Sequence, residues 1–121
     1  MILADTSVWI EHFRKTSPPL QSILEQGLVL LHPAVFGELA CGNFTRRDHV
    51  LQSLAVMPQA KSATHPELLT LINAHKLWGV GIGWIDAQLL ASCLLTPCRL
   101  WTLDQRLRSA AAKSGVAVFE P

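Results

Sequence analysis

Short apolar runs and amphipathic stretches alternate along this chain, and the alternation predicts strands separated by helices. The run ILAD at positions 2–5 is typical of a short buried strand, and it ends on an acid, Asp5. The next segment, 6–15, places Trp9 and Phe13 on the apolar side of a helix. The first unit is therefore a strand followed directly by a helix.

Proline, glycine and changes of period mark the remaining elements. We expect helices at 18–25, 33–41, 46–57, 66–78, 84–95 and 105–114, and strands at 28–31, 99–104 and 116–119. Parallel neighbours in a sheet need helical crossovers of this kind. The predicted fold class is therefore α/β, a three-layer α/β/α sandwich with a central, mainly parallel sheet.

The length of 121 residues suits one compact domain, 1–121, with a core of its own. Half of the residues are hydrophobic and only 16% are charged, which argues against disorder and favours a surface that a partner buries. No apolar run approaches the ~20 residues that cross a bilayer, and the N-terminus carries no basic signal-peptide region. The three cysteines follow no metal-binding or disulfide spacing. We therefore expect a cytoplasmic protein.

Four acidic residues stand where such a sheet would gather them. Asp5 and Asp104 come at the ends of predicted strands, Glu38 lies about one turn into a predicted helix, and Asp86 lies near the start of another. In open parallel sheets the ligand crevice lies beyond the carboxyl ends of the strands, so we expect these side chains to face one crevice. Four carboxylates repel unless a cation joins them, and their hard oxygen atoms favour Mg²⁺ or Mn²⁺. Such a site can hydrolyse phosphodiesters with an activated water.

The net charge of +1 conceals an uneven distribution of charge. Ten Lys and Arg residues face nine Asp and Glu residues, so setting aside the four acids above leaves five acids and a balance of +5. A basic body around an acidic site suits a ligand with a phosphate backbone. An excess of this size is also common on ordinary protein surfaces, and the charge alone does not decide between the two.

Four sequence stretches together resemble a known family. They are DTSVWI at 5–10, FGEL at 36–39, GWIDAQLLAS at 83–92 and LWTLDQRL at 100–107. In this order and at these positions they are similar to PIN domains, specifically to the VapC-type toxin ribonucleases of bacterial toxin–antitoxin pairs. The resemblance spans almost the whole chain. One departure is Leu107, where family members often carry an aromatic residue, and it concerns packing rather than the acids.

The resemblance implies an activity, a site and partners. The four acids would be the catalytic and metal-binding residues, holding one or two Mg²⁺ or Mn²⁺ ions for the cleavage of single-stranded or loop RNA. Thr6 or Ser7, together with Thr102, occupy the hydroxyl positions that the family places beside these acids. The family also implies a homodimer and a cognate, VapB-like antitoxin as the partner of the toxin.

The acids also suit purely structural roles, and a function without catalysis stays open. Asp5 and Asp104 can cap the helices that follow them, and Asp86 can interact favourably with a helix dipole. The alternative function is a non-catalytic RNA- or protein-binding module with a PIN-like fold. If RNA binds, the side chains predicted to contact it are Arg46, Arg47, Trp84, Arg99 and Arg106.

Overall fold

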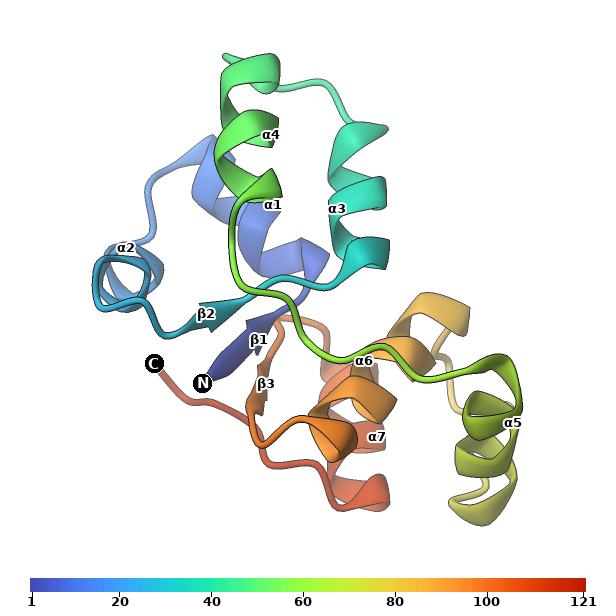
Figure 1. Cartoon of the computed structure of the whole chain (residues 1–121). Coiled ribbons are helices and arrows are strands. Elements are labelled where there is room, and N and C mark those ends of the chain that lie inside the picture. The colour runs from blue at the N-terminus through green and yellow to red at the C-terminus, as the bar shows by residue number, and fades with distance from the viewer.

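A sheet of three parallel strands forms the centre of the computed structural model, which describes residues 1–121 (Figure 1). The strand order is β2-β1-β3, so the first strand of the chain is the central one. The strands are β1 (Ile2–Ala4), β2 (Val29–Leu30) and β3 (Arg99–Trp101). The helices are α1 (Thr6–Arg14), α2 (Pro18–Glu25), α3 (Pro33–Ala40), α4 (Arg47–Ala55), α5 (His65–Ala74), α6 (Trp84–Leu95) and α7 (Gln105–Ser114). The predicted α/β class and the parallel sheet are confirmed.

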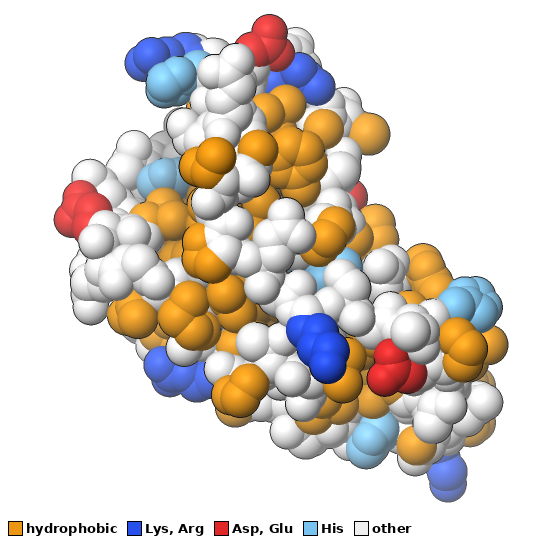
Figure 2. All heavy atoms as spheres, viewed as in Figure 1, with side chains coloured by type: hydrophobic (Ala, Val, Ile, Leu, Met, Phe, Trp, Pro, Cys, Tyr) orange, Lys and Arg blue, Asp and Glu red, His pale blue; other side chains and the backbone are white.

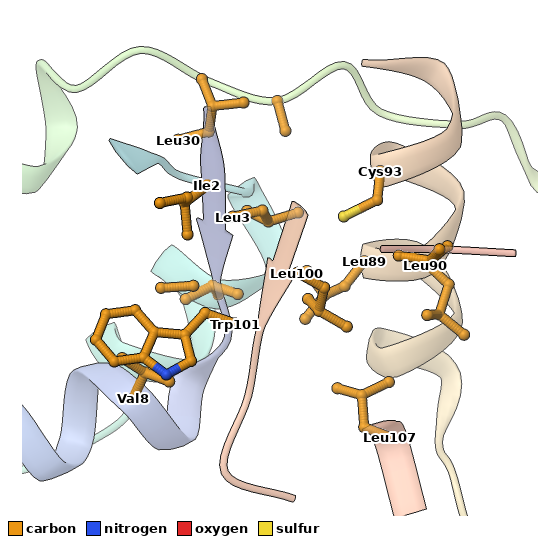
Figure 3. Packing of buried hydrophobic residues seen from close by; sticks show 14 of the residues in the cluster. Ile2, Leu3, Val8, Leu30, Leu89, Leu90, Cys93, Leu100, Trp101 and Leu107 are labelled. Atoms are coloured by element: carbon orange, nitrogen blue, oxygen red, sulfur yellow. The ribbon is translucent and has the colours of Figure 1, made fainter. Parts of the chain in front are cut away.

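Helices cover both faces of the sheet, and successive residues of β1 and β3 point to opposite faces (Figure 3). Leu3 of β1 and Leu100 of β3 are paired in register, and both point toward α6. Trp101, the next residue of β3, points to the other face, on which α1 carries Val8. This is the period-two pattern of pleated strands that are buried on both sides.

One hydrophobic cluster of 27 buried residues joins the sheet to its helices. Leu3, Leu100 and Leu107 are completely excluded from solvent, so Leu107 fills its core position with an aliphatic side chain. Truncation of one such leucine to alanine typically lowers the free energy of unfolding by about 2–5 kcal/mol. The core therefore fixes β1 and β3 just before the points at which the acidic residues follow.

Two elements near the C-terminal half are shorter than the sequence predicts. The helix predicted at 66–78 ends at Ala74, and Lys76 just beyond it adopts a left-handed conformation with a φ of 53°. The last predicted strand, 116–119, is reduced to a single isolated bridge from Val118 to β3. The sheet therefore has three strands, with the C-terminal segment only touching its edge.

The strands also end early on the side of the sheet where the candidate site lies. The strand predicted at 99–104 ends at Trp101, whose carbonyl accepts a hydrogen bond from the Asp5 amide at 2.9 Å. The residues after Trp101 leave the sheet. The Thr102 hydroxyl donates to Asp5, and the Asp104 carboxylate accepts from the Arg106 amide. β2 has two residues, and Leu31 beyond it forms one isolated bridge with Gln59.

Hydrophobic side chains also reach the surface, as Figure 2 shows for one face of the molecule. Trp78, Trp84 and Leu103 are among the large exposed ones, with exposed fractions of 62%, 43% and 52%. None of the helices combines the length and the apolar character that a membrane crossing requires. The partner surface expected from the composition stays a prediction.

Candidate active site

Asp5 forms the buried centre of the candidate site. It follows β1 directly and caps α1, because its Oδ1 atom accepts a hydrogen bond from the Val8 amide at 3.2 Å. The same oxygen accepts a hydrogen bond from the Ser7 hydroxyl, and Oδ2 accepts one from the Thr102 hydroxyl. Asp5 is only 5% exposed. The capping role expected for Asp5 is therefore real, and it leaves the carboxylate oriented by three donors.

The electrostatic state of Asp5 reflects two opposing effects. Burial raises the pKa of the Asp5 carboxyl, while the hydrogen bonds from Ser7 and Thr102 lower this pKa by smaller amounts. A buried carboxylate with a raised pKa is less stable in its charged form than one in water, and a nearby cation would favour ionisation. The residues around Asp5 thus fix its position without removing the cost of its charge.

The segment after β3 is tied to the segment after β1 by hydroxyl groups. Besides donating to Asp5, the Thr102 hydroxyl accepts a hydrogen bond from the Asp104 amide at 3.0 Å. The Ser7 hydroxyl in turn accepts one from the Leu103 amide at 3.1 Å. The bonds from Thr102 to Asp5 and from Leu103 to Ser7 join residues 97 and 96 positions apart, and they hold the two strand ends together. Thr102 and Ser7 are therefore positioning residues for the acids.

Asp104 lies at the exposed N-terminus of α7. Its Oδ1 atom caps the helix by accepting hydrogen bonds from the amides of Arg106, at 2.8 Å, and Leu107, at 3.4 Å. Its second oxygen, Oδ2, accepts no hydrogen bond from the protein. Capping and ligand binding are therefore compatible uses of this one side chain.

Asp86 lies in the first turn of α6 and is half-buried. Its Oδ2 atom accepts a hydrogen bond from the Gly83 amide at 3.1 Å, which closes the start of the helix. Burial raises the pKa of the Asp86 carboxyl most, and the negative charges of Asp104 and Asp5 raise it further. Like charges influence one another in this way only when they are close. The structure therefore brings Asp5, Asp86 and Asp104 within electrostatic reach of one another.

Glu38 completes the set from the exposed surface of α3. Its Oε1 atom accepts a hydrogen bond from the Thr6 hydroxyl at 2.9 Å, so the first residue of α1 connects Glu38 to the neighbour of Asp5. Glu38 also lines a cleft of about 500 Å³ that runs along α1 and the residues after α3. The fourth acid is thus attached to the site through a hydroxyl rather than by burial.

The acids do not form a finished metal site. No group of three or more His, Cys, Asp or Glu side chains is arranged so that it could hold a metal ion as it stands. The carboxylates instead accept hydrogen bonds from helix starts and hydroxyls, as described above. Their chemistry still fits a hard divalent cation, because the mutual repulsion that raises the pKa of Asp86 is the repulsion that such a cation relieves.

Comparison with known proteins places the chain in a family. It is 48% identical over 121 residues to Ribonuclease VapC32 of Mycobacterium tuberculosis strain CDC 1551 / Oshkosh, covering 99% of this chain and 98% of that protein. The same values hold for Ribonuclease VapC32 of strain ATCC 25618 / H37Rv. The chain belongs to the VapC-type PIN-domain ribonuclease toxins. No family model matches the chain. The family resemblance and the PIN-like fold predicted from the sequence are confirmed.

The predicted RNA contacts of this VapC-type chain lie in different places. Arg47 pairs with Asp48 and donates to the carbonyl of Ala40, while Arg46 precedes α4 in a left-handed conformation. Arg99 begins β3, at the end of the strand away from the acids. The arginines of this group therefore do not form one basic surface.

Trp84 and Arg106 lie closer to the acids. Trp84 is the first residue of α6, two positions before Asp86, and its ring lies 5.1 Å from that of His65. Arg106 lies in the first turn of α7, two positions after Asp104. Sequence reasoning missed the contact that places the Arg106 side chain, which involves Gly81 of the glycine-rich loop GVGIG at 79–83. The only signal in the sequence was the density of glycines in that loop.

Proposed function

We propose that this protein is a metal-dependent endoribonuclease that cleaves single-stranded or loop RNA as the toxin of a toxin–antitoxin pair. The observation that carries this proposal is the buried Asp5 carboxylate, which the Thr102 hydroxyl links to the Asp104 amide at the carboxyl ends of two parallel strands. Membership of the VapC-type family supports the same activity. A non-catalytic role is less well supported, because all four acids expected of the family are present.

The four acids share one metal site in the proposal, and neighbouring hydroxyl groups hold them in place. Asp5, Glu38, Asp86 and Asp104 would hold Mg²⁺ or Mn²⁺, with Asp5 as the fixed ligand and the others approaching from α3, α6 and α7. A bound ion of this kind supplies an activated water and neutralises charge on the phosphate. Thr102 and Ser7 orient Asp5, and the Thr6 hydroxyl restrains Glu38.

The proposal includes partners and organisation. The whole chain, 1–121, would act as one PIN-like nuclease domain in the cytoplasm, inhibited by a cognate VapB-like antitoxin and assembled as a homodimer. Exposed hydrophobic side chains such as Leu69, Leu94 and Leu95 support burial by partners, because they are large and lie on helices α5 and α6.

Cleavage of a mixed pool of small RNAs tests the proposal. We expect purified protein to cut RNA with Mg²⁺ or Mn²⁺ and to lose this activity with EDTA. The variant Asp5→Asn keeps the size of the side chain and an oxygen for Val8 and Ser7, yet it removes the charge. We expect this variant to be inactive with either metal.

The matched control is Asp48→Asn, which removes an exposed acid that pairs with Arg47 on α4. This control should cut RNA as the wild type does. Equal cleavage by Asp5→Asn and wild type would contradict the proposal, and so would full activity in EDTA. If the wild type cuts RNA, sequencing of the cut ends identifies the RNA target.

A further inference from the structure

Three arginines lie in the C-terminal quarter of the chain, and two of them have partners within the protein. Arg108 forms an ion pair with Glu120, and the guanidinium of Arg99 lies 5.0 Å from the centroid of the Phe119 ring. The guanidinium of Arg106 forms no ion pair and no hydrogen bond within the chain. Arg106 is therefore the arginine of this group whose charge is free for a ligand.

The Arg106 side chain nevertheless has a defined position, because it packs directly against Gly81. We call this contact the seat of Arg106. A Cβ atom added to Gly81 would lie 2.5 Å from Cδ, 3.1 Å from Nε and 3.3 Å from Nη1 of Arg106. Real Cβ atoms do not approach other atoms to 2.5 Å, so the side chain rests where only glycine leaves room. The φ of 86° at Gly81 also favours glycine. The absence of a side chain at Gly81 therefore determines where the Arg106 side chain lies.

The contact places the Arg106 side chain beside the loop that leads into Asp86. Arg106 belongs to the first turn of α7, where its own amide donates to Asp104. Gly81 precedes Gly83, whose amide donates to Asp86 at 3.1 Å. The Arg106 side chain thus crosses from the element that carries Asp104 to the loop that leads into Asp86, yet it pairs with neither carboxylate.

We propose that Arg106, seated on Gly81, binds a phosphate of the RNA strand beside the acidic site. This inference rests on the proposed ribonuclease function and names the residue that brings the polyanion to it. Four carboxylates repel an RNA backbone, and a fixed cation at their edge offsets that repulsion for one phosphate. A guanidinium with all its donors free can bind phosphate oxygens in a bidentate manner.

Binding of a short, fluorescently labelled single-stranded RNA of randomised sequence tests the inference, measured in EDTA across a series of KCl concentrations. One lost phosphate contact on a single strand reduces the slope of log affinity against log salt by about 0.7. We expect this reduction for Arg106→Gln, and an affinity lower by about tenfold at low salt. Arg106→Lys keeps the charge and should retain most of the slope. Arg108→Gln, at the partnered arginine, should leave both quantities unchanged.

Glycine variants distinguish the loss of the contact between Gly81 and Arg106 from backbone strain in the loop. Gly81→Ala should weaken RNA binding about as much as Arg106→Gln, since the new methyl group displaces the arginine. Gly79→Ala is the matched control, because its φ of 69° is similarly unfavourable but no atom lies within 4 Å of its Cβ position. The double variant Gly81→Ala/Arg106→Gln should bind no more weakly than Arg106→Gln alone. Thermal melting of each variant shows whether it is folded.

The outcomes distinguish this inference from the ribonuclease proposal. Wild-type salt dependence in Arg106→Gln would overturn the inference while leaving cleavage by the wild type untouched. A reduced slope in Arg106→Gln, with no cleavage by wild type in any metal, would support the inference and contradict the ribonuclease. Failure of the wild type to bind the RNA probe at any salt concentration would overturn the inference as well. An equal effect of Gly79→Ala and Gly81→Ala would overturn the role of the seat.

Discussion

Asp5 and Glu38 belong to the same candidate site, but the protein holds them in opposite ways. Asp5 is almost completely buried and accepts hydrogen bonds from an amide and two hydroxyls. Glu38 is exposed on α3 and accepts one hydrogen bond, from Thr6. The inner acid is held by the sheet and the core, whereas the outer acid is held by a single exposed hydrogen bond. The site therefore combines a buried acid with several hydrogen bonds and an exposed acid with one.

The two acids therefore differ in how much their negative charge destabilises the folded state. A buried charge without a counterion destabilises the folded state, and the hydrogen bonds to Asp5 offset only part of that cost. An exposed carboxylate such as Glu38 remains hydrated and carries little such penalty. A fixed, partly desolvated ligand binds a cation with less rearrangement, so the inner acid should contribute most to the site.

The largest expected effect comes from exchanging the two acids for their amides. Asp5→Asn should reduce the rate of RNA cleavage by at least about 100-fold, as the loss of a charge-stabilising group at a reacting centre does. Glu38→Gln should cause a smaller loss, because its amide oxygen can still accept the Thr6 hydrogen bond. Initial rates on one RNA substrate measure both. A greater loss in Glu38→Gln than in Asp5→Asn would reverse the proposed ranking.

The hydroxyls that orient the two acids should follow the same ranking. Thr102→Val keeps the shape of the side chain but removes the donor to Asp5, and we expect about a 10- to 100-fold loss of activity or metal affinity. Thr6→Val removes one exposed hydrogen bond worth about 1 kcal/mol, so its loss should stay below about tenfold. Metal titrations of the RNA-cleavage rate compare the two. Equal effects would mean that burial of the hydrogen bond does not matter here.

The smallest expected effect concerns stability and pH without metal. The raised pKa values of Asp5 and Asp86 mean that the folded protein retains protons that the unfolded chain has released. The free energy of unfolding should therefore fall as pH rises above about 4, the usual pKa of an aspartate, until the raised pKa values are passed. Asp5→Asn removes the part of this decrease in the free energy of unfolding that comes from Asp5. It also removes one of the negative charges that raise the pKa of Asp86.

Thermal melting in EDTA from pH 4 to 8 measures this effect, at conditions that leave the acids without a cation. The histidines with pKa values lowered by burial, His12 and His32, act in the opposite direction, so the comparison of variant with wild type isolates the acids. We expect Asp5→Asn to melt at or above the wild-type temperature near pH 7. A lower melting temperature at pH 7 would contradict the raised pKa of Asp5.

The sequence was sufficient to locate the acids because they obey simple positional rules. Asp5 and Asp104 follow buried strands, so their chain positions predict capping, and Asp86 lies in the first turn of a helix whose dipole favours its charge. The helices at 18–25, 84–95 and 105–114 were predicted to the residue for the same reason, since proline, glycine and apolar period mark their ends.

The contacts that hold the site could not be predicted in this way. The Thr102 hydroxyl meets Asp5 across 97 positions, and no local pattern encodes such a bond. The seat of Arg106 on Gly81 depends likewise on how α7 packs beside the glycine loop. Strand ends were misjudged because the apolar pattern continues past Trp101, whereas the chain leaves the sheet to reach Asp5. Long-range packing decides these details.

Calorimetric titration of Mn²⁺ into metal-free protein near pH 7 tests the central claim most directly, because it requires no RNA substrate. The wild type should bind Mn²⁺ with a saturable heat, Glu38→Gln should bind it more weakly, and Asp5→Asn should show no specific binding. The same affinity in Asp5→Asn as in the wild type would contradict the claim that the buried acid after β1 anchors the metal site.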